Sequence, residues 1–262
     1  MSEFDGKVAI VAGALGIGRA AALRLATDGA TVVICSDRED QTESTVEELR
    51  AEGLDVGGLR ADVTSSEDMR TLVDFTLRSY GGVDVLVNSA GVQRYGTVVD
   101  TEEVVWDEVM DVNLKGIYLA SRYAIPRMRE RGGGAIVNVS SVQALASQKG
   151  VAAYTASKGG INALTRAMAV DHAEENIRVN AVCPASVDTP MLRWSAELFG
   201  GKSVEETLGD WGKMHPLGRV ARAEEVAEVI AFLAGPRASF VTGGEYRVDG
   251  GLLAALGVAL PE

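Results

Sequence analysis

Ser141, Tyr154 and Lys158 are residues whose types and spacing could move a proton on and off a hydroxyl group. Tyr154 and Lys158 are four residues apart in an Ala-rich segment that we expect to be helical, so both side chains would lie on one face. An ammonium beside a phenol favours the phenolate and lowers its pKa, which turns a poor base into a usable one. The hydroxyl of Ser141 could then hydrogen-bond a carbonyl or alkoxide oxygen next to the phenol.

Two predicted elements must hold these three residues together. Residues 135–139 form an apolar run that predicts a buried strand ending just before Ser141, where active sites lie in open α/β sheets. A helix over residues 152–176 would carry Tyr154 and Lys158. A Tyr-x-x-x-Lys pair alone could begin an ordinary helix, with Ser141 as one more serine at a strand end. The three residues together with a glycine-rich segment near the N-terminus favour an active site instead.

The glycine-rich segment separates the first predicted strand from the first predicted helix. Residues 7–12 form a continuous apolar strand, and a helix rich in Ala and Leu begins near Gly16 and ends near Asp28. Backbone N–H groups between them could approach a pyrophosphate at the positive end of the helix. We therefore expect a dinucleotide site in the segment Gly13, Ala14, Leu15, Gly16, Ile17 and Gly18.

These motifs together resemble the short-chain dehydrogenase/reductase family in its compact single-domain branch, over nearly the whole chain. The family's pattern Thr-Gly-x-x-x-Gly-Ile-Gly has three residues between its first two glycines, whereas this chain has two. Either Ala12 and Gly13 match Thr-Gly and the loop is one residue short, or Val11 and Ala12 replace that pair. We favour the short loop, because the strand then keeps its register.

Alternating strands and helices favour an α/β fold with a doubly wound, mostly parallel sheet. The resemblance implies a Rossmann-type sheet of seven strands in the order 3-2-1-4-5-6-7, with helices on both faces, in a single domain over residues 1–262. Near the C-terminus we expect a strand over residues 177–183, a helix over residues 222–234 and a closing strand within residues 241–251.

Asp37 follows the second predicted strand, residues 31–36, and bears on the choice of cofactor. A carboxylate at this point accepts hydrogen bonds from the ribose hydroxyls of NAD and repels the additional phosphate of NADP. The apolar Leu15, where NADP-preferring relatives often carry a basic residue, also favours NAD. Against this, Ser36 fills the commonest position for the acid, Arg38 could meet a phosphate, and Asp37 could simply be the N-cap of a helix over residues 39–52.

The resemblance places further cofactor contacts at the ends of other strands. These are Asp62 and Val63 for the adenine, the segment Asn88-Ser89-Ala90-Gly91, and Lys158 for the nicotinamide ribose together with Tyr154. A loop that resembles the family's Pro-Gly loop would fix the nicotinamide face, with Pro184, Val187 and Thr189 as its contacts. By itself, Asp62 could equally cap the helix that opens at Ser65.

Asn113 lies inside a long amphipathic helix that we expect over residues 101–131, although Asn is a poor helix former. The resemblance implies that it supports the proton relay through a water connecting Lys158 to solvent. The alternative is a local hydrogen bond at a bend in the helix.

The substrate end is less well marked by the sequence. Residues 190–216 are irregular in pattern and favour a lid over the substrate, although the aromatic residues there could equally be packing. We expect the substrate to contact Ser141, Tyr154, Gln93, Gln143 and Trp194. With Arg94, Gln148 and His215 these residues would make a polar pocket, which favours a sugar, a polyol or a cyclic diol.

Composition excludes several classes of partner. The chain of 262 residues carries a net charge of −12 and has a sequence pI near 4.8, with no basic stripe, so we expect neither a nucleic-acid partner nor binding to an anionic membrane. Cys35 and Cys183 lie in apolar runs and favour buried free thiols in a reducing compartment. With no signal peptide and no apolar run that could span a bilayer, we expect a cytoplasmic protein. His172 and His215 are too isolated to indicate a metal site.

Together these features predict an NAD-dependent dehydrogenase that reversibly oxidises a secondary alcohol, a small molecule, to a ketone. The alternative is an NADPH-dependent ketone or 3-oxoacyl reductase; an acidic acyl carrier protein would need a basic docking patch, which a net charge of −12 disfavours. A non-catalytic dinucleotide-binding protein would not require the Ser-Tyr-Lys-Asn set. The resemblance and the apolar tail, residues 252–262, predict a homotetramer.

Overall fold

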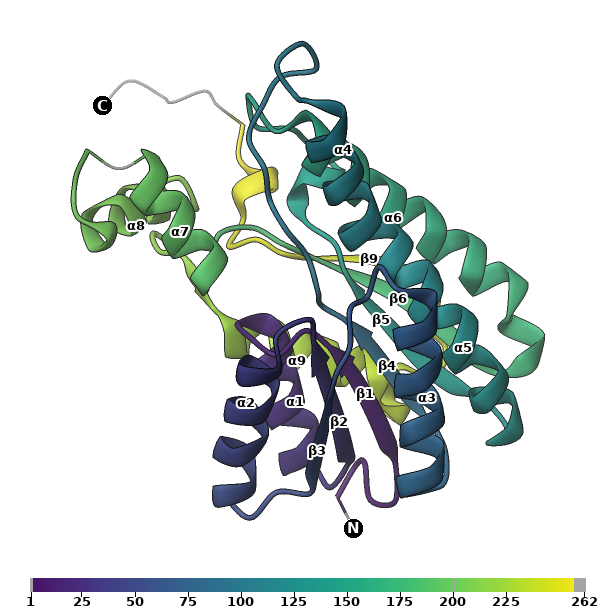
Figure 1. Ribbon diagram of the computed structural model, residues 1–262. Coiled ribbons are helices and arrows are strands. Elements are labelled where there is room, and N and C mark those ends of the chain that lie inside the picture. Colours follow the sequence, from purple (N-terminus) through teal and green to yellow (C-terminus); the bar gives the residue numbers. More distant parts are fainter. Residues whose placement is uncertain (1, 200, 257–262) are drawn as a thin grey trace.

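The computed structural model describes residues 2–199 and 201–256. Its centre is a parallel sheet of seven strands in the order β3-β2-β1-β4-β5-β6-β9 (Figure 1), which confirms the predicted fold class and strand order. The strands are β1 (Val8–Ala12), β2 (Thr31–Ser36), β3 (Val56–Arg60), β4 (Val85–Asn88), β5 (Gly134–Val139), β6 (Ile177–Pro184) and β9 (Glu245–Val248).

Helices cover both faces of the sheet, which explains why its strands are apolar throughout rather than alternating. One face packs against α1 (Ile17–Thr27), α2 (Glu39–Ala51) and α9 (Ala223–Ala234). The other packs against α3 (Ser66–Tyr80), α5 (Gly116–Glu130) and α6 (Ala152–Asp171), and α4 (Glu103–Met110) lies on α6.

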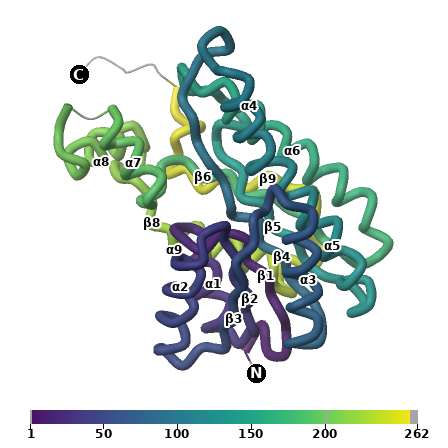
Figure 2. Tube along the Cα trace, in the orientation of Figure 1, coloured from purple at the N-terminus to yellow at the C-terminus, as the bar shows by residue number. Residues whose placement is uncertain are grey.

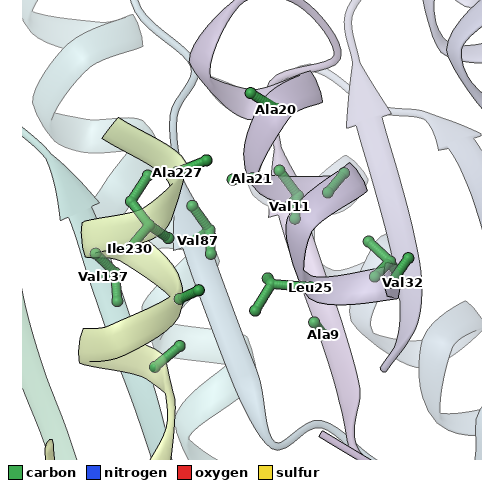
Figure 3. Packing of buried hydrophobic residues seen from close by; sticks show 14 of the residues in the cluster. Ala9, Val11, Ala20, Ala21, Leu25, Val32, Val87, Val137, Ala227 and Ile230 are labelled. Carbon is green, nitrogen blue, oxygen red and sulfur yellow. The ribbon is translucent and has the colours of Figure 1, made fainter. Parts of the chain in front are cut away.

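Successive residues of β1 belong to different cores. Ala9 and Val11 point towards α1 and α9, where Leu25 and Ile230 meet them (Figure 3), whereas Ile10 belongs to the core on the other face. Burial of an aliphatic side chain of this size stabilises the fold by about 1.5–3 kcal/mol. Both layers therefore hold the carboxyl ends of the strands in fixed positions.

The helices differ from expectation in three places. The expected helix over residues 101–131 is interrupted between α4 and α5 by a π-helical turn, Asp111–Lys115, which contains Asn113. Helix α6 ends at Asp171 rather than at residue 176, and a 3-10 turn, Ala173–Glu175, follows it. The expected irregular pattern over residues 190–216 is wrong, because most of these residues form α7 (Pro190–Phe199) and α8 (Val204–Gly212).

Local chemistry accounts for α8. Ser203 and Glu206 form a capping box at the start of α8, which satisfies two backbone N–H groups that a short helix would otherwise expose. Figure 2 shows α7 and α8 side by side at the carboxyl ends of the strands, apart from the two helical layers. A small parallel pair, β7 (Val187–Asp188) with β8 (Ala221–Arg222), joins this region to α9.

At the C-terminus, the closing strand is β9, in the middle of the expected range of 241–251, and a 3-10 turn, Leu252–Ala254, follows it. Of the apolar tail, residues 257–262 lie outside the described residues. Within the described part of the chain, no helix is both long and apolar enough to cross a bilayer.

Candidate active site

A cleft of about 1580 Å³ lies at the carboxyl ends of the strands and extends from the glycine-rich segment to α7 and α8. It brings together most of the residues predicted from the sequence: Gly13, Leu15, Gly16, Ile17, Asp37, Asp62, Val63, Ala90, Gly91, Gln93, Ser141, Gln143, Tyr154, Lys158, Pro184, Val187 and Thr189. Four other predicted residues do not line it: Gly18, Asn88, Asn113 and Trp194.

The glycine-rich segment closes one end of the cleft. Strand β1 ends at Ala12, and the N–H of Gly13 donates to Cys35 O at 2.9 Å, so the loop begins at Gly13 as in the short-loop alternative. Gly16 has a φ of 53°, a conformation that an L side chain rarely adopts. Gly18 serves packing rather than contact, because a Cβ there would overlap the carbonyl oxygen of Gly13.

The Asp37 carboxylate lies on the cleft wall and does not cap α2. The N-cap is Arg38, without a side-chain hydrogen bond. Ser36 Oγ is used within the turn, where it accepts from Arg38 N at 3.0 Å. The Arg38 guanidinium donates to both oxygens of Asp40, at 3.1 and 2.7 Å, and does not line the cleft.

Asp62 and Val63 follow β3 on the same wall. The cap of α3 is Ser65, whose Oγ accepts from Asp68 N at 3.1 Å, so Asp62 is not the cap. Instead Asp62 Oδ1 accepts from the backbone N–H and the hydroxyl of Thr64, both at 2.8 Å. Asn88 is buried away from the cleft, where its Nδ2 donates to Asn138 Oδ1 at 2.8 Å.

The first turns of α6 position Tyr154 and Lys158 as predicted, on one face. Lys158 Nζ lies 5.3 Å from the centroid of the Tyr154 ring and donates to Val139 O at 2.9 Å. Ser141 Oγ, beyond the end of β5, accepts from Gln143 N at 3.1 Å. All three side chains are buried and line the cleft.

Burial dominates the electrostatics of this set. It raises the pKa of Tyr154 to about 12, since an apolar environment disfavours the phenolate, while a hydrogen bond with Ser141 acts in the lowering direction. Burial also lowers the pKa of Lys158 to about 8. In the protein alone burial is the largest influence on the pKa of Tyr154, and its lowering by Lys158 stays a prediction for the complex with cofactor.

Asn113 is fully buried in the π-helical turn, and protein groups satisfy its side chain. Its Oδ1 accepts from Val92 N at 2.7 Å, and its Nδ2 donates to Val92 O at 2.9 Å and to Ser157 Oγ at 3.0 Å. None of these is the local hydrogen bond of the alternative, because Val92 and Ser157 lie on other segments of the chain. It still lies close to the reacting end, because a Cβ on Gly91 would be 3.3 Å from Asn113 Oδ1 and 3.7 Å from Lys158 Nζ.

Polar side chains at the substrate end are bonded mainly to one another. Gln143 Oε1 accepts from Thr155 Oγ1 at 3.3 Å, and Gln143 Nε2 donates to Gln148 Oε1 at 3.4 Å. The Arg94 guanidinium is held by the carboxylate of Glu108.

His215 uses both ring nitrogens. Its Nδ1 bonds Trp211 O at 3.0 Å, so this nitrogen carries the proton, and its Nε2 accepts from Ser186 N at 3.4 Å. Many polar groups of the pocket are thus already bonded within the protein. The pocket therefore offers fewer free hydrogen-bonding groups than its residue types indicated.

Trp194 does not take the position that sequence reasoning assigned to it, and Tyr95 lines the cleft instead. The Trp194 ring does not line the cleft but stacks on Tyr95, with centroids 6.0 Å apart, so its position does not support the expected substrate contact. Tyr95 lines the cleft and was missed, because no motif marks it. The position of Tyr95 four residues after Gly91 predicts no role by itself. Its importance is visible only from its contacts with α7. Among the described residues there is no cluster of three or more side chains that could hold a metal ion.

Fold and site together define an oxidoreductase with a parallel dinucleotide-binding sheet and a Ser-Tyr-Lys set at its carboxyl edge. A family model described as Enoyl-(Acyl carrier protein) reductase matches residues 11–253. The cyclohexanol dehydrogenase of an Acinetobacter species is 37% identical over 95% of this chain and 96% of its own. The 3-oxoacyl-acyl-carrier-protein reductase FabG of Thermotoga maritima is 40% identical over 96% of this chain and 99% of its own.

A solved structure agrees with these relatives. The ligand-free aldohexose dehydrogenase of Thermoplasma acidophilum has a TM-score of 0.92 and 38% identity, over 100% of this chain and 99% of that one. The chain belongs to the short-chain dehydrogenase/reductase family, whose members are oxidoreductases that bind a nicotinamide dinucleotide.

Proposed function

We propose that the protein is an NAD-dependent dehydrogenase that reversibly oxidises a secondary alcohol to a ketone. The observation that carries this proposal is the position of Ser141, Tyr154 and Lys158 on one wall of a cleft whose opposite end holds the glycine-rich segment and Asp37. A dinucleotide with its pyrophosphate at the start of α1 would extend along this cleft, with its nicotinamide near Tyr154.

Tyr154 is the general base of the proposed oxidation, and Lys158 lowers its pKa and binds the nicotinamide ribose. The substrate O–H proton passes to the phenolate of Tyr154 while the hydroxyl of Ser141 holds the substrate oxygen. The carbinol C–H bond breaks, its electron pair leaves as hydride, and the C=O bond forms. A bound oxidised nicotinamide would supply the acceptor for this hydride. Burial raises the pKa of Tyr154 further above neutral pH in the protein alone, so the positive charges of Lys158 and of the oxidised ring have to lower it in the complex.

The proposed preference for NAD rests on charge at the adenosine end. The Asp37 carboxylate would accept hydrogen bonds from ribose hydroxyls and repel a 2′-phosphate. Arg38, which could meet that phosphate, is engaged by Asp40 instead. The Asp37 carboxylate and the pairing of Arg38 with Asp40 would both favour NAD, the cofactor without the additional phosphate.

The substrate class proposed is a sugar, a polyol or a cyclic alcohol. The names of two relatives support two of these classes, since one is a cyclohexanol dehydrogenase and the other an aldohexose dehydrogenase. The second candidate function, NADPH-dependent reduction of a ketone or 3-oxoacyl group, is favoured by the 40% identity to a 3-oxoacyl reductase. A non-catalytic dinucleotide-binding role is the weakest, because pure binding requires no Ser-Tyr-Lys set.

A screen of both directions with both cofactors tests the proposal. Purified protein is assayed for reduction of NAD and NADP with sugars, polyols and cyclic alcohols, and for oxidation of NADH and NADPH with the matching ketones and a 3-oxoacyl thioester. NAD-linked oxidation of at least one secondary alcohol supports the dehydrogenase. Activity confined to NADPH and 3-oxoacyl thioesters identifies the reductase, and no turnover with any pair overturns both.

We further propose a homotetramer, built as one domain and working in the cytoplasm. Helices α5 and α6 would form one subunit interface, where a hollow of about 400 Å³ lies between them, lined by Met110, Asp111, Leu114, Lys115, Tyr118, Gly160 and Leu164. Light scattering at micromolar concentration should give four times the chain mass, and a monomeric mass would overturn the assembly.

A further inference from the structure

The loop from Gly91 to Gly96 has no regular structure of its own, yet neighbouring elements fix it at three points. The side chain of Asn113 holds both the N–H and the C=O of Val92, at 2.7 and 2.9 Å. Gly96 pairs with the start of α6, since its N–H donates to Gly150 O at 2.8 Å and its C=O accepts from Ala152 N at 3.2 Å. The ion pair of Arg94 with Glu108 on α4 supplies the third point.

Tyr95 projects from this fixed loop into the space between α6 and the lid helix α7. Its ring meets Phe199 edge-on, with centroids 4.4 Å apart and planes at 82°, and stacks on Trp194 at 6.0 Å. Burial raises the pKa of Tyr95, and a hydrogen bond with the buried Ser195 of the same helix acts in the lowering direction. One side chain thus joins α7 to the helix that carries Tyr154.

Tyr95 also lines the cleft that holds Tyr154, together with Phe199 and Trp211. A charge on its phenol would raise the pKa of Tyr154. The polar groups nearby are largely used, because Gln143, Gln148 and Thr155 bond one another. An apolar aromatic wall with few free donors suits a hydrocarbon ring better than a ring covered with hydroxyl groups.

We propose that Tyr95 is a positioning and specificity-determining residue: its ring fastens α7 over the substrate and selects an alicyclic secondary alcohol with few further hydroxyl groups. The substrate part of this inference rests on the proposed alcohol oxidation. The role of Tyr95 in holding α7 does not rest on that proposed oxidation, because it concerns contacts within the protein.

The test compares two six-membered carbocycles, cyclohexanol and myo-inositol, which differ in the number of hydroxyl groups. The wild-type protein should oxidise cyclohexanol with the higher kcat/KM. Tyr95→Ala should raise KM for cyclohexanol about tenfold or more with a smaller change in kcat, since two aromatic contacts are lost. Tyr95→Phe keeps the ring and loses only the hydroxyl, so its KM should stay within about threefold of wild type.

Hydrogen exchange of the α7 amides is a second readout, which needs no substrate. It should be about fivefold faster or more in Tyr95→Ala and nearly unchanged in Tyr95→Phe, because the helix loses its packing partner only in the first. The matched control is Tyr80→Ala, which removes a half-buried tyrosine that meets Phe75 edge-on at 6.3 Å, outside the cleft. Tyr80→Ala should change neither the KM nor the exchange of α7.

The outcomes separate this inference from the proposed function. Unchanged α7 exchange in Tyr95→Ala overturns the fastening role. A preference for inositol, or for an aldohexose over cyclohexanol, overturns the proposed selectivity while the dehydrogenase function stands. If no alcohol is oxidised with either cofactor, the proposed function fails along with the substrate part, and the exchange result alone decides the fastening part.

Discussion

Tyr154 is only 8% exposed, and its hydroxyl is the acidic group that the proposed chemistry requires. Tyr154→Phe removes that group and keeps the ring, so the rate of alcohol oxidation should fall by about 100-fold or more. NADH should bind as before, which fluorescence titration measures. Turnover within tenfold of wild type would refute the role assigned to Tyr154.

The pKa of Tyr154 also predicts how the rate depends on pH. Because burial raises this pKa to about 12, the base form is scarce at neutral pH and becomes commoner as pH rises. Between about pH 6 and 8, below the pKa of about 8 at which Lys158 would lose its charge, the oxidation rate should rise by up to about tenfold per unit. The value of kcat/KM for NAD at constant ionic strength, which reports the pKa values of the free enzyme, measures it, and a flat profile would exclude Tyr154 as the titrating base.

Asp37 gives the prediction on cofactor choice. Two like charges about 4 Å apart at an effective dielectric near 20 repel by roughly 4 kcal/mol, before solvent reduces the figure. Even a third of that gives roughly tenfold preference for NAD. Asp37→Asn should therefore weaken NAD and improve NADP, lowering the ratio of their kcat/KM values by about tenfold. Glu39→Gln, on the same helix end but outside the cleft, is the control; the same ratio in wild type and Asp37→Asn would contradict the prediction.

At the scale of elements, the π-helical turn places Asn113 against the loop after β4. A sequence pattern places a poor helix former inside a helix, but it does not show which backbone groups the side chain will reach. The three bonds to Val92 and Ser157 arise only because α4, α5 and α6 pack beside that loop.

Asn113→Ala removes all three bonds and leaves a buried backbone N–H and C=O without them. We expect the free energy of unfolding to fall by about 2–4 kcal/mol and the rate to fall by about tenfold or more, because Gly91 beside Lys158 loses its support. Ser157→Ala removes one of these bonds and should cost about 1 kcal/mol. Denaturant unfolding and steady-state rates on both variants measure these effects; equal stability of Asn113→Ala and wild type would contradict them.

At the scale of the whole molecule, Asp84 joins the starts of β1 and β4 to the end of α5, at the edge of the sheet opposite the cleft. Burial alone would raise its pKa, but the N–H of Val8 at 3.0 Å, Arg131 and Lys7 together hold the pKa below its ordinary value. The carboxylate is 5% exposed, so its partners act with little screening.

This arrangement predicts a pH-dependent stability. A depressed pKa contributes stability that is fully present above the unfolded value of about 3.9 and is lost as pH falls through the folded value. Asp84→Asn should thus be less stable than wild type at pH 7 by about 2 kcal/mol, and the gap should close below about pH 4. Denaturant unfolding at both pH values measures it.

Asp210→Asn is the contrasting control. The pKa of Asp210 is lowered to about 2 by Lys202 and Lys213, yet the group is exposed, so solvent screens the pair. We expect Asp210→Asn to leave stability nearly unchanged. A larger loss in Asp210→Asn than in Asp84→Asn would refute the argument that burial decides the effect.

The sequence by itself determined the doubly wound α/β class and the wall of the cleft that carries Ser141, Tyr154 and Lys158, and the strand order came from the resemblance to the family. Continuous apolar strands between helices admit few other arrangements, and the spacing of Tyr154 and Lys158 is a property of one helix. Local rules also placed Asp37 and the glycine-rich segment at strand ends. They did not place α7 and α8, whose short segments mix helical and turn signals.

Only the tertiary structure decided what surrounds those residues. The raised pKa of Tyr154, the partners of Asn113 and the contact of Tyr95 with α7 each depend on segments that are distant in the chain and adjacent in space. Burial and hydrogen-bond satisfaction are sums over all neighbours, whatever their position in the sequence. No local sequence pattern predicts burial or hydrogen-bond satisfaction, because the neighbours of a residue are fixed only when the helical layers pack against the sheet.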